Sequence, residues 1–262
     1  MNLKKLILTQ NGCYKAGRTI KPKGIMVHST GANNPNLKRY VGPDDGLLGR
    51  NQYNNHWNRE KPGGRQVCVH AFIGKLKDGS IATYQTLPWN HRGWHSGGSA
   101  NNTHISLEIC EDGLADASYF FAVYKEAVEL CVYLCKLYNL TEKDIICHSE
   151  GHKLGIASNH ADVMHWFPKH GKSMDTFRDD VKATLRSNVA SKKTPVKPYL
   201  VKVSIPNLNI RKGPGTNYSK LGKYTGIGVF TIVEESDGKG ATKWGKLKSG
   251  AGWISLDYTR KI

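Results

Sequence analysis

The decisive stretch of the sequence is Cys147-His148-Ser149-Glu150-Gly151-His152, which is followed shortly by Ser158-Asn159-His160-Ala161-Asp162. A distant histidine, His28, ends the apolar run Ile25-Met26-Val27. Two histidines and one carboxylate are the ligand set of a catalytic zinc site whose fourth position stays open for water, whereas structural zinc sites more often use thiolates and close all four positions. His28, His148 and Asp162 therefore predict a zinc site for hydrolysis.

Each of these residues also has an ordinary interpretation, since a single histidine at the end of a strand is often a satisfied core residue. We expect His28 and His148 at strand ends and Asp162 in a polar loop, where the three can converge. His148 and His152 are four apart, as in helical zinc peptidases, but Ser149 replaces the required Glu and Gly151 disfavours a helix. The peptidase motif is therefore disfavoured.

The chain is strongly basic, with 38 Lys and Arg against 21 Asp and Glu in 262 residues, a net charge of +17. Residues 186–262 hold 15 basic and 4 acidic side chains, so most of the excess lies in the last quarter. Such a charge favours an anionic partner, either nucleic acid or a cell-wall polymer, or serves solubility alone. The sequence has no arginine-rich helix or basic-region motif, so we predict no nucleic-acid partner.

The six cysteines show no Cys-x-x-Cys spacing. Cys131 and Cys135 share one face of a predicted helix, so we expect buried free thiols and no disulfide framework. The sequence contains no window of 18 or more apolar residues, so we expect no membrane-inserted helix. The apolar run near the N-terminus is too short for a signal peptide, so we expect synthesis in the cytoplasm and release during lysis.

Residues 1–188 are predicted to form an α/β or α+β domain. Strands are expected at 25–28, 67–73, 81–87 and 105–109, with a hairpin at Asp78-Gly79. Helical spacing predicts helices at 119–138 and 175–188. Polar residues 36–60 predict loops and short helices.

The composition changes after Val189. Residues 189–199 predict an extended linker rich in Lys and Pro. Residues 200–262 predict a small all-β barrel, with short strands at 199–203, 208–210, 229–233, 244–247 and 253–255. Tyr218, Tyr224 and Trp244 offer aromatic surface for peptide or sugar, unless their rings pack the barrel.

Four motifs together carry a resemblance: Val27-His28-Ser29-Thr30, Trp94-His95-Ser96-Gly97, residues 102–109, and residues 148–162. Their order resembles zinc N-acetylmuramoyl-L-alanine amidases of the type 2 family, which is related to peptidoglycan recognition proteins. The resemblance covers about residues 20–170. It implies a mixed central sheet flanked by helices.

The resemblance also implies roles for single residues. His28, His148 and Asp162 would bind zinc, Glu108 would activate water, and His160 would steady the transition state. Trp94 and His95 are candidate groove-wall contacts for a glycan or peptide stem, unless Trp94 is simply a core residue. The chain departs from the family pattern at Val163-Met164, which replace a common Pro-Gly, and in a longer segment between His148 and Asp162.

Residues 208–218 and Gly252-Trp253-Ile254 resemble bacterial Src-homology-3-like domains that bind cell wall. The two resemblances together imply a two-domain enzyme of phage or prophage endolysin type that cuts peptidoglycan. A host autolysin with the same chemistry, a stem-peptide endopeptidase and a non-catalytic peptidoglycan-binding protein remain alternatives.

Overall fold

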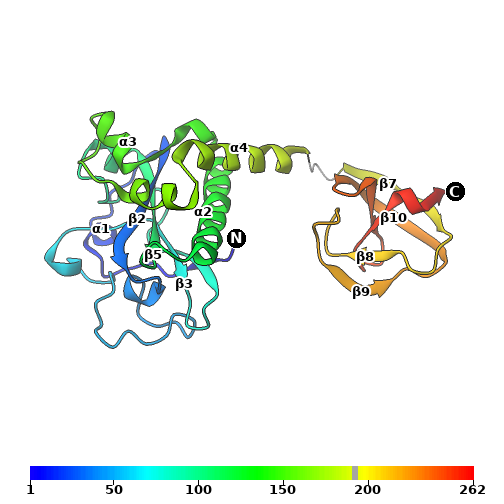
Figure 1. Cartoon of the computed structure of the whole chain (residues 1–262), viewed down its shortest axis with the longest axis horizontal. Coiled ribbons are helices and arrows are strands. Elements are labelled where there is room, and N and C mark those ends of the chain that lie inside the picture. Colours follow the sequence, from blue (N-terminus) through cyan, green and yellow to red (C-terminus); the bar gives the residue numbers. More distant parts are fainter. Residues whose placement is uncertain (191–193) are drawn as a thin grey trace. The chain divides into compact units, whose positions relative to one another are not determined.

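The computed structural model describes residues 1–190 and 194–262, with side chains described at 1–186 and 196–262. Its contacts divide the chain into two compact units, Met1–Thr184 and Leu185–Ile262. In Figure 1 the larger unit runs from blue to green, and the strands of the smaller unit are yellow to red. Within the described residues, no helix is both long enough and apolar enough to cross a bilayer.

The larger unit is built on a six-stranded sheet with the order β1-β4-β3-β5-β2-β6. Only β3 and β4 pair antiparallel, so the sheet is mixed, as predicted. Their hairpin closes at the predicted turn, where Gly79 has φ +84°. The strands are β1 (Leu3–Lys5), β2 (Gly24–Asn33), β3 (Ala71–Lys75), β4 (Ile81–Gln85), β5 (His104–Glu111) and β6 (Ile145–Cys147).

Helix α2 (Ala117–Tyr138) packs against β3 and β4 and lies alongside the sheet in Figure 1. It begins where the Asp116 side chain accepts a hydrogen bond from the Tyr119 amide, and it ends at Asn139 in the left-handed region. The other helices are α1 (Gly12–Lys15), α3 (His148–Lys153) and α4 (Met174–Ala190). Short 3-10 turns occupy Leu37–Arg39, Pro62–Gly64, Ser99–Asn102, Glu142–Asp144, Asp162–His165 and Phe167–His170.

Helix α3 corrects an expectation, because Gly151 lies inside it. A Cβ atom at this position would approach Met26 Cε of β2 to 2.8 Å. Glycine therefore lets α3 pack closely on Met26 without displacing the end of that side chain, at the cost that glycine brings to a helix. The peptidase motif still lacks its glutamate, and His152 is exposed.

The opposite face of the sheet is covered by the long segment between β2 and β3. Its apolar side chains Leu37, Tyr40 and Leu48 are buried against Phe72 and Tyr84. Trp57 adds an aromatic contact to this cluster, with ring centroids 5.0 Å from Phe72 and 6.2 Å from Tyr40. The predicted loops are thus a packed layer over the sheet.

A disulfide joins Cys13 to Cys68 across 55 residues, where the sequence indicated no pairing. Cys110, Cys131, Cys135 and Cys147 are buried free thiols, which confirms the expectation for Cys131 and Cys135.

The smaller unit contains an antiparallel sheet with the order β13-β7-β10-β11-β12-β8-β9. Its core includes Val201, Val203, Ile232, Leu247 and Ile254. The all-β architecture is as predicted, and closure into a barrel stays a prediction. The strands are β7 (Thr194–Val203), β8 (Asn209–Arg211), β9 (Lys220–Tyr224), β10 (Gly228–Gly238), β11 (Ala241–Leu247), β12 (Trp253–Ser255) and β13 (Thr259–Lys261), with a 3-10 turn at Leu256–Tyr258.

The predicted linker at 189–199 is corrected at both ends. Residues 189–190 belong to α4, and residues 194–199 belong to β7. Its remaining residues, 191–193, lie outside the described part of the chain. Strands β9 and β13 were not predicted, because they are short and mostly exposed and their sequences carry no clear apolar run.

Candidate metal centre and groove

The register of the central sheet brings His28 and His148 together. Val27 of β2 pairs with Cys147, the last residue of the parallel strand β6, and the residue that follows each of them in the sequence is a histidine. His148 is also the first residue of α3. Both side chains are buried at the same place on the sheet.

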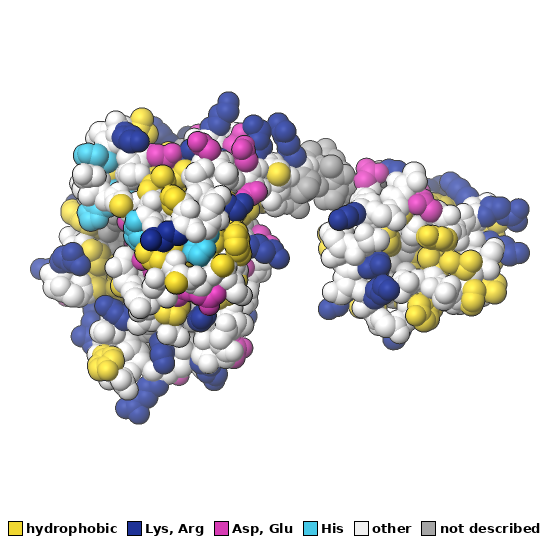
Figure 2. Space-filling model, viewed as in Figure 1, with side chains coloured by type: hydrophobic (Ala, Val, Ile, Leu, Met, Phe, Trp, Pro, Cys, Tyr) yellow, Lys and Arg dark blue, Asp and Glu magenta, His cyan; other side chains and the backbone are white. Residues whose placement is uncertain are grey.

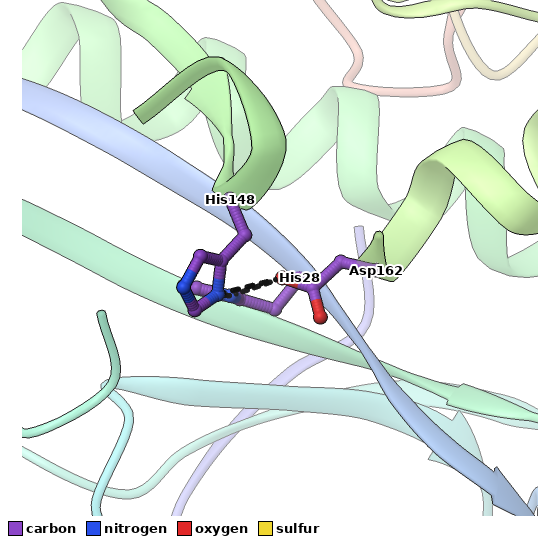
Figure 3. A group of neighbouring side chains, drawn as sticks. All are labelled: His28, His148 and Asp162. Carbon is purple, nitrogen blue, oxygen red and sulfur yellow. Dashed lines mark hydrogen bonds and ion pairs between the residues drawn. The ribbon is translucent and has the colours of Figure 1, made fainter. Parts of the chain in front are cut away.

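Asp162 completes the cluster from the 3-10 turn that it begins. Its Oδ2 atom lies 2.8 Å from Nδ1 of His28 and 2.9 Å from Nδ1 of His148. Figure 3 shows the two rings and the carboxylate turned toward one another. Asp162 has φ +44°, a left-handed conformation that aspartate tolerates better than most residues.

The donor atoms fit a metal ion. One ligand atom from each residue lies within 4.8 Å of the others, and no other such group occurs among the described residues. The second ring nitrogens are already engaged: His28 Nε2 lies 3.0 Å from His95 Nδ1, and His148 Nε2 lies 3.1 Å from Ser158 Oγ. Metal-binding histidines are commonly oriented through their second nitrogen in this way.

The protonation states also suit metal binding. Burial lowers the pKa of His28, despite the opposing effect of the nearby Asp162, which favours the neutral ring. Burial alone would raise the pKa of Asp162, but hydrogen bonds from His148 and His28 bring it well below its usual range. Neutral imidazole and ionised carboxylate are the forms that bind zinc.

Glu108 lies beside this cluster on β5. It pairs in register with His28 on one side and with Phe72 of β3 on the other, so its side chain points to the same face of the sheet. Its Oε2 atom is buried without a hydrogen-bond partner among the described residues. Burial, followed by the charges of Asp162 and Glu111, raises the pKa of Glu108 well above its usual value. A carboxyl group of this kind can accept and return a proton.

His160 is exposed at the rim, where its ring stacks on His148 with centroids 4.7 Å apart. It lines the same groove as the three candidate ligands. This position allows a hydrogen bond to a group bound beside the cluster.

Trp94 and His95, both predicted to contact substrate, differ in their surroundings. Trp94 is 39% exposed, lines the groove and carries the Arg92 guanidinium 4.9 Å above its ring. His95 contacts His28, and its Nε2 atom is buried without a hydrogen-bond partner in the described chain. The geometry favours a positioning role for His95, while substrate contact by Trp94 stays a prediction.

The groove has a volume of about 800 Å³ and extends from the candidate ligands to the layer formed by residues 39–67. Three arginines of that layer, Arg39, Arg59 and Arg65, line it together with Tyr40. Sequence reasoning missed these residues, because they lie in a polar segment without a motif. Ser158 was missed as a partner of His148, although it stands two residues before His160.

The aromatic residues predicted to bind cell wall are divided. Tyr218 is 43% exposed and Tyr224 is 60% exposed, but Trp244 is only 3% exposed. Trp244 therefore offers no open aromatic face, in contrast to the prediction. It lines a cavity of about 330 Å³ with Asn209 and Tyr258, and its Nε1 atom has no hydrogen-bond partner within the described residues.

Comparisons with known proteins agree with this architecture. A family model described as N-acetylmuramoyl-L-alanine amidase matches residues 18–165, more than half of the chain and all three candidate ligands. No curated protein matches the chain in a sequence comparison.

Solved structures of similar fold include the PlyG catalytic domain, at 19% identity and a TM-score of 0.50 over 75% of this chain and 100% of that one. The Staphylococcus aureus hydrolase AmiA in complex with its ligand gives 20% identity and a TM-score of 0.51 over 72% of this chain and 84% of that one. A mutant form of PlyL gives 20% identity and a TM-score of 0.50 over 70% and 99% of the two chains. At these identities the likeness shows a shared fold.

Proposed function

The chain belongs to the N-acetylmuramoyl-L-alanine amidase family, and on this premise we propose that it hydrolyses peptidoglycan at a zinc site formed by His28, His148 and Asp162. The bond cut is the amide between the lactyl group of N-acetylmuramic acid and L-alanine of the stem peptide. The observation that supports the proposal best is that three ligand atoms converge in the groove that Glu108 also lines, where the Glu108 Oε2 atom has no hydrogen-bond partner among the described residues.

His28, His148 and Asp162 would hold the zinc ion, which would supply a Lewis acid to polarise the amide carbonyl and lower the pKa of water. Glu108 accepts a proton from the attacking water while the water oxygen forms a bond to the carbonyl carbon. Glu108 then delivers that proton to the alanine nitrogen as the carbon–nitrogen bond breaks. The raised pKa of Glu108, caused mainly by burial, favours the protonated carboxyl that this second step requires.

His160 is proposed to stabilise the oxyanion that develops on the lactyl carbonyl. Its ring is exposed to the groove and rests on His148, so a ring N–H can reach a group bound beside the ligands. A donor aimed at developing negative charge contributes more in the transition state than in the ground state.

The smaller unit is proposed to hold the enzyme on the cell wall, in an endolysin that acts on peptidoglycan during lysis. Residues 186–262 carry 15 basic and 4 acidic side chains, which favour contact with anionic wall polymers. Figure 2 shows lysine and arginine side chains on the visible face of both units.

The proposal is tested by digesting purified peptidoglycan with the zinc-loaded protein and analysing the fragments by mass spectrometry. Release of intact stem peptides with a new L-alanine amino terminus is expected. New amino termini within the stem would instead identify an endopeptidase. A chelator should abolish the release, and added zinc should restore it.

A further inference from the structure

The groove is strongly asymmetric in charge. Its two acidic side chains, Glu108 and Asp162, lie at the metal end, while Arg39, Arg59 and Arg65 come from the layer over the sheet. Arg39 Nη1 donates a hydrogen bond to the Asn55 carbonyl at 2.8 Å, and Arg59 Nη2 donates to the Asn54 carbonyl. These partners are neutral, and within the described part of the chain no carboxylate forms an ion pair with the three arginines. Their positive charge is therefore uncompensated.

The wall that carries the arginines is anchored to the N-terminal segment. Asn11 Nδ2 donates hydrogen bonds to the carbonyls of Trp57 and Val67, both at 3.0 Å. The Gly12 amide donates to the Glu60 carbonyl at 3.1 Å, and the Cys13–Cys68 disulfide closes the end of the same segment. Trp57 then fixes the wall to the sheet through its contact with Phe72. These contacts hold in place the segment that carries the three arginines.

The chemistry of peptidoglycan identifies what this charge can bind. The lactyl carboxyl is consumed in the scissile amide and the N-acetylated sugars are neutral, so the carboxylates near the scissile bond belong to the stem peptide. Guanidinium groups bind carboxylates through paired, charge-assisted hydrogen bonds. We propose that Arg39, Arg59 and Arg65 form the stem-peptide subsite and select stems with free carboxylates over stems whose carboxylates are amidated.

This assignment rests on the proposed function and adds a direction to it. The stem extends from the metal centre toward the segment that carries Arg39, Arg59 and Arg65. An amidated stem keeps its size, but it loses the negative charge, and an NH2 donor replaces one of the two acceptor oxygens that a guanidinium group binds. The arginines then lose their ionic partner and must be partly desolvated without compensation.

The test uses two synthetic N-acetylmuramyl pentapeptides that differ only in their carboxyl groups, which are free in one and converted to carboxamides in the other. The zinc-loaded full chain should cleave the free form with kcat/KM at least tenfold higher. This preference should shrink in each of Arg39→Gln, Arg59→Gln and Arg65→Gln and vanish in the triple variant. Arg50→Gln is the matched control, because Arg50 lies outside this groove.

The outcomes separate the two proposals. Equal cleavage of both pentapeptides by the wild type, or a preference that survives in the triple variant, overturns the subsite. Cleavage of neither pentapeptide overturns the proposed function itself. Thermal unfolding of each variant shows that a lost preference does not reflect a lost fold, and binding of both pentapeptides to the Glu108→Gln protein gives the same comparison without turnover.

Discussion

The Nε2 atom of His28 lies 3.0 Å from the Nδ1 atom of His95, and the two rings meet edge to face at an interplanar angle of 74°. Burial lowers the pKa of both rings, His95 further than His28, so both are neutral near pH 7. One proton must lie between the two atoms. With a metal ion bound, His28 would donate this proton to His95, so that Nδ1 of His28, which hydrogen-bonds to Asp162 in this structure, would present its lone pair to the metal.

His95→Ala is therefore expected to weaken zinc binding by about 10- to 100-fold, the usual effect of removing a residue that orients a ligand. Zinc affinity is measured by competition with a chromophoric chelator. Trp94→Ala is the comparison, because Trp94 lines the groove without contacting a ligand, and it should leave zinc affinity unchanged. If His95→Ala changed KM and left zinc affinity unaltered, His95 would contact substrate and would not orient His28.

Glu108→Gln keeps the shape of the side chain and removes its ability to take a proton. We expect normal zinc content and a kcat at least tenfold lower, since a positioned acid–base group contributes roughly 10²- to 10⁴-fold. The measurements are metal analysis of the purified variant and release of stem peptides from peptidoglycan. Turnover equal to that of the wild type would exclude Glu108 from the mechanism.

The candidate ligands could be predicted from the sequence because strand register alone brings two of them together. His28 follows the apolar run Ile25-Met26-Val27 and His148 follows the short strand β6, and β2 pairs with β6 so that these positions are adjacent; His28 lies inside β2, which continues to Asn33, and not at the predicted strand end. The hairpin at Gly79 and helix α2 were also predicted, since both depend on local patterns of turn residues and apolar spacing.

The side of the groove formed by Arg39, Arg59 and Arg65 could not be predicted in this way. Its position depends on contacts distant in sequence, such as the disulfide between Cys13 and Cys68 and the hydrogen bonds of Asn11 to Trp57 and Val67. None of these contacts has a periodic or motif signal. The same is true of the pairing of His28 with His95, because two histidines far apart in sequence give no indication that one orients the other.

The Cys13–Cys68 disulfide should stabilise the larger unit and hold in place the segment that carries Arg39, Arg59 and Arg65. Closing a loop of 55 residues limits the unfolded chain, and such crosslinks typically contribute about 2–4 kcal/mol. Cys13→Ser is expected to lower the unfolding temperature, as is reduction of the wild type by dithiothreitol. Reductant should have no further effect on the variant, and an equal effect on both proteins would point to another target.

His70 gives the fold a specific dependence on pH. Burial lowers its pKa from 6.5 to about 4, while it donates a hydrogen bond from Nε2 to the His91 carbonyl and accepts one from the Ser106 amide. The unfolded chain binds a proton below pH 6.5 and the folded chain does not, so this contribution to stability is present above pH 6.5 and is lost as pH falls toward 4.

The shift corresponds to a loss of about 2 kcal/mol in the free energy of unfolding between about pH 7.5 and pH 5. His70→Gln cannot titrate, so its stability should fall less over this range than that of the wild type. Urea unfolding at both pH values provides the comparison. Parallel losses in the two proteins would show that other groups cause the acid sensitivity.

The proposed roles of the two units can be separated by a chain that ends at Ala190, the last residue of α4. Its sheet, its three candidate ligands and its groove belong to the larger unit, so it should cleave a soluble muramyl peptide at an unchanged rate. Binding to purified cell walls should fall, because the removed residues include most of the excess positive charge. Binding by the full chain should also weaken as salt is raised, since salt screens exposed charges. Pull-down with cell walls measures both effects, and equal binding by the two chains would place wall recognition in the larger unit.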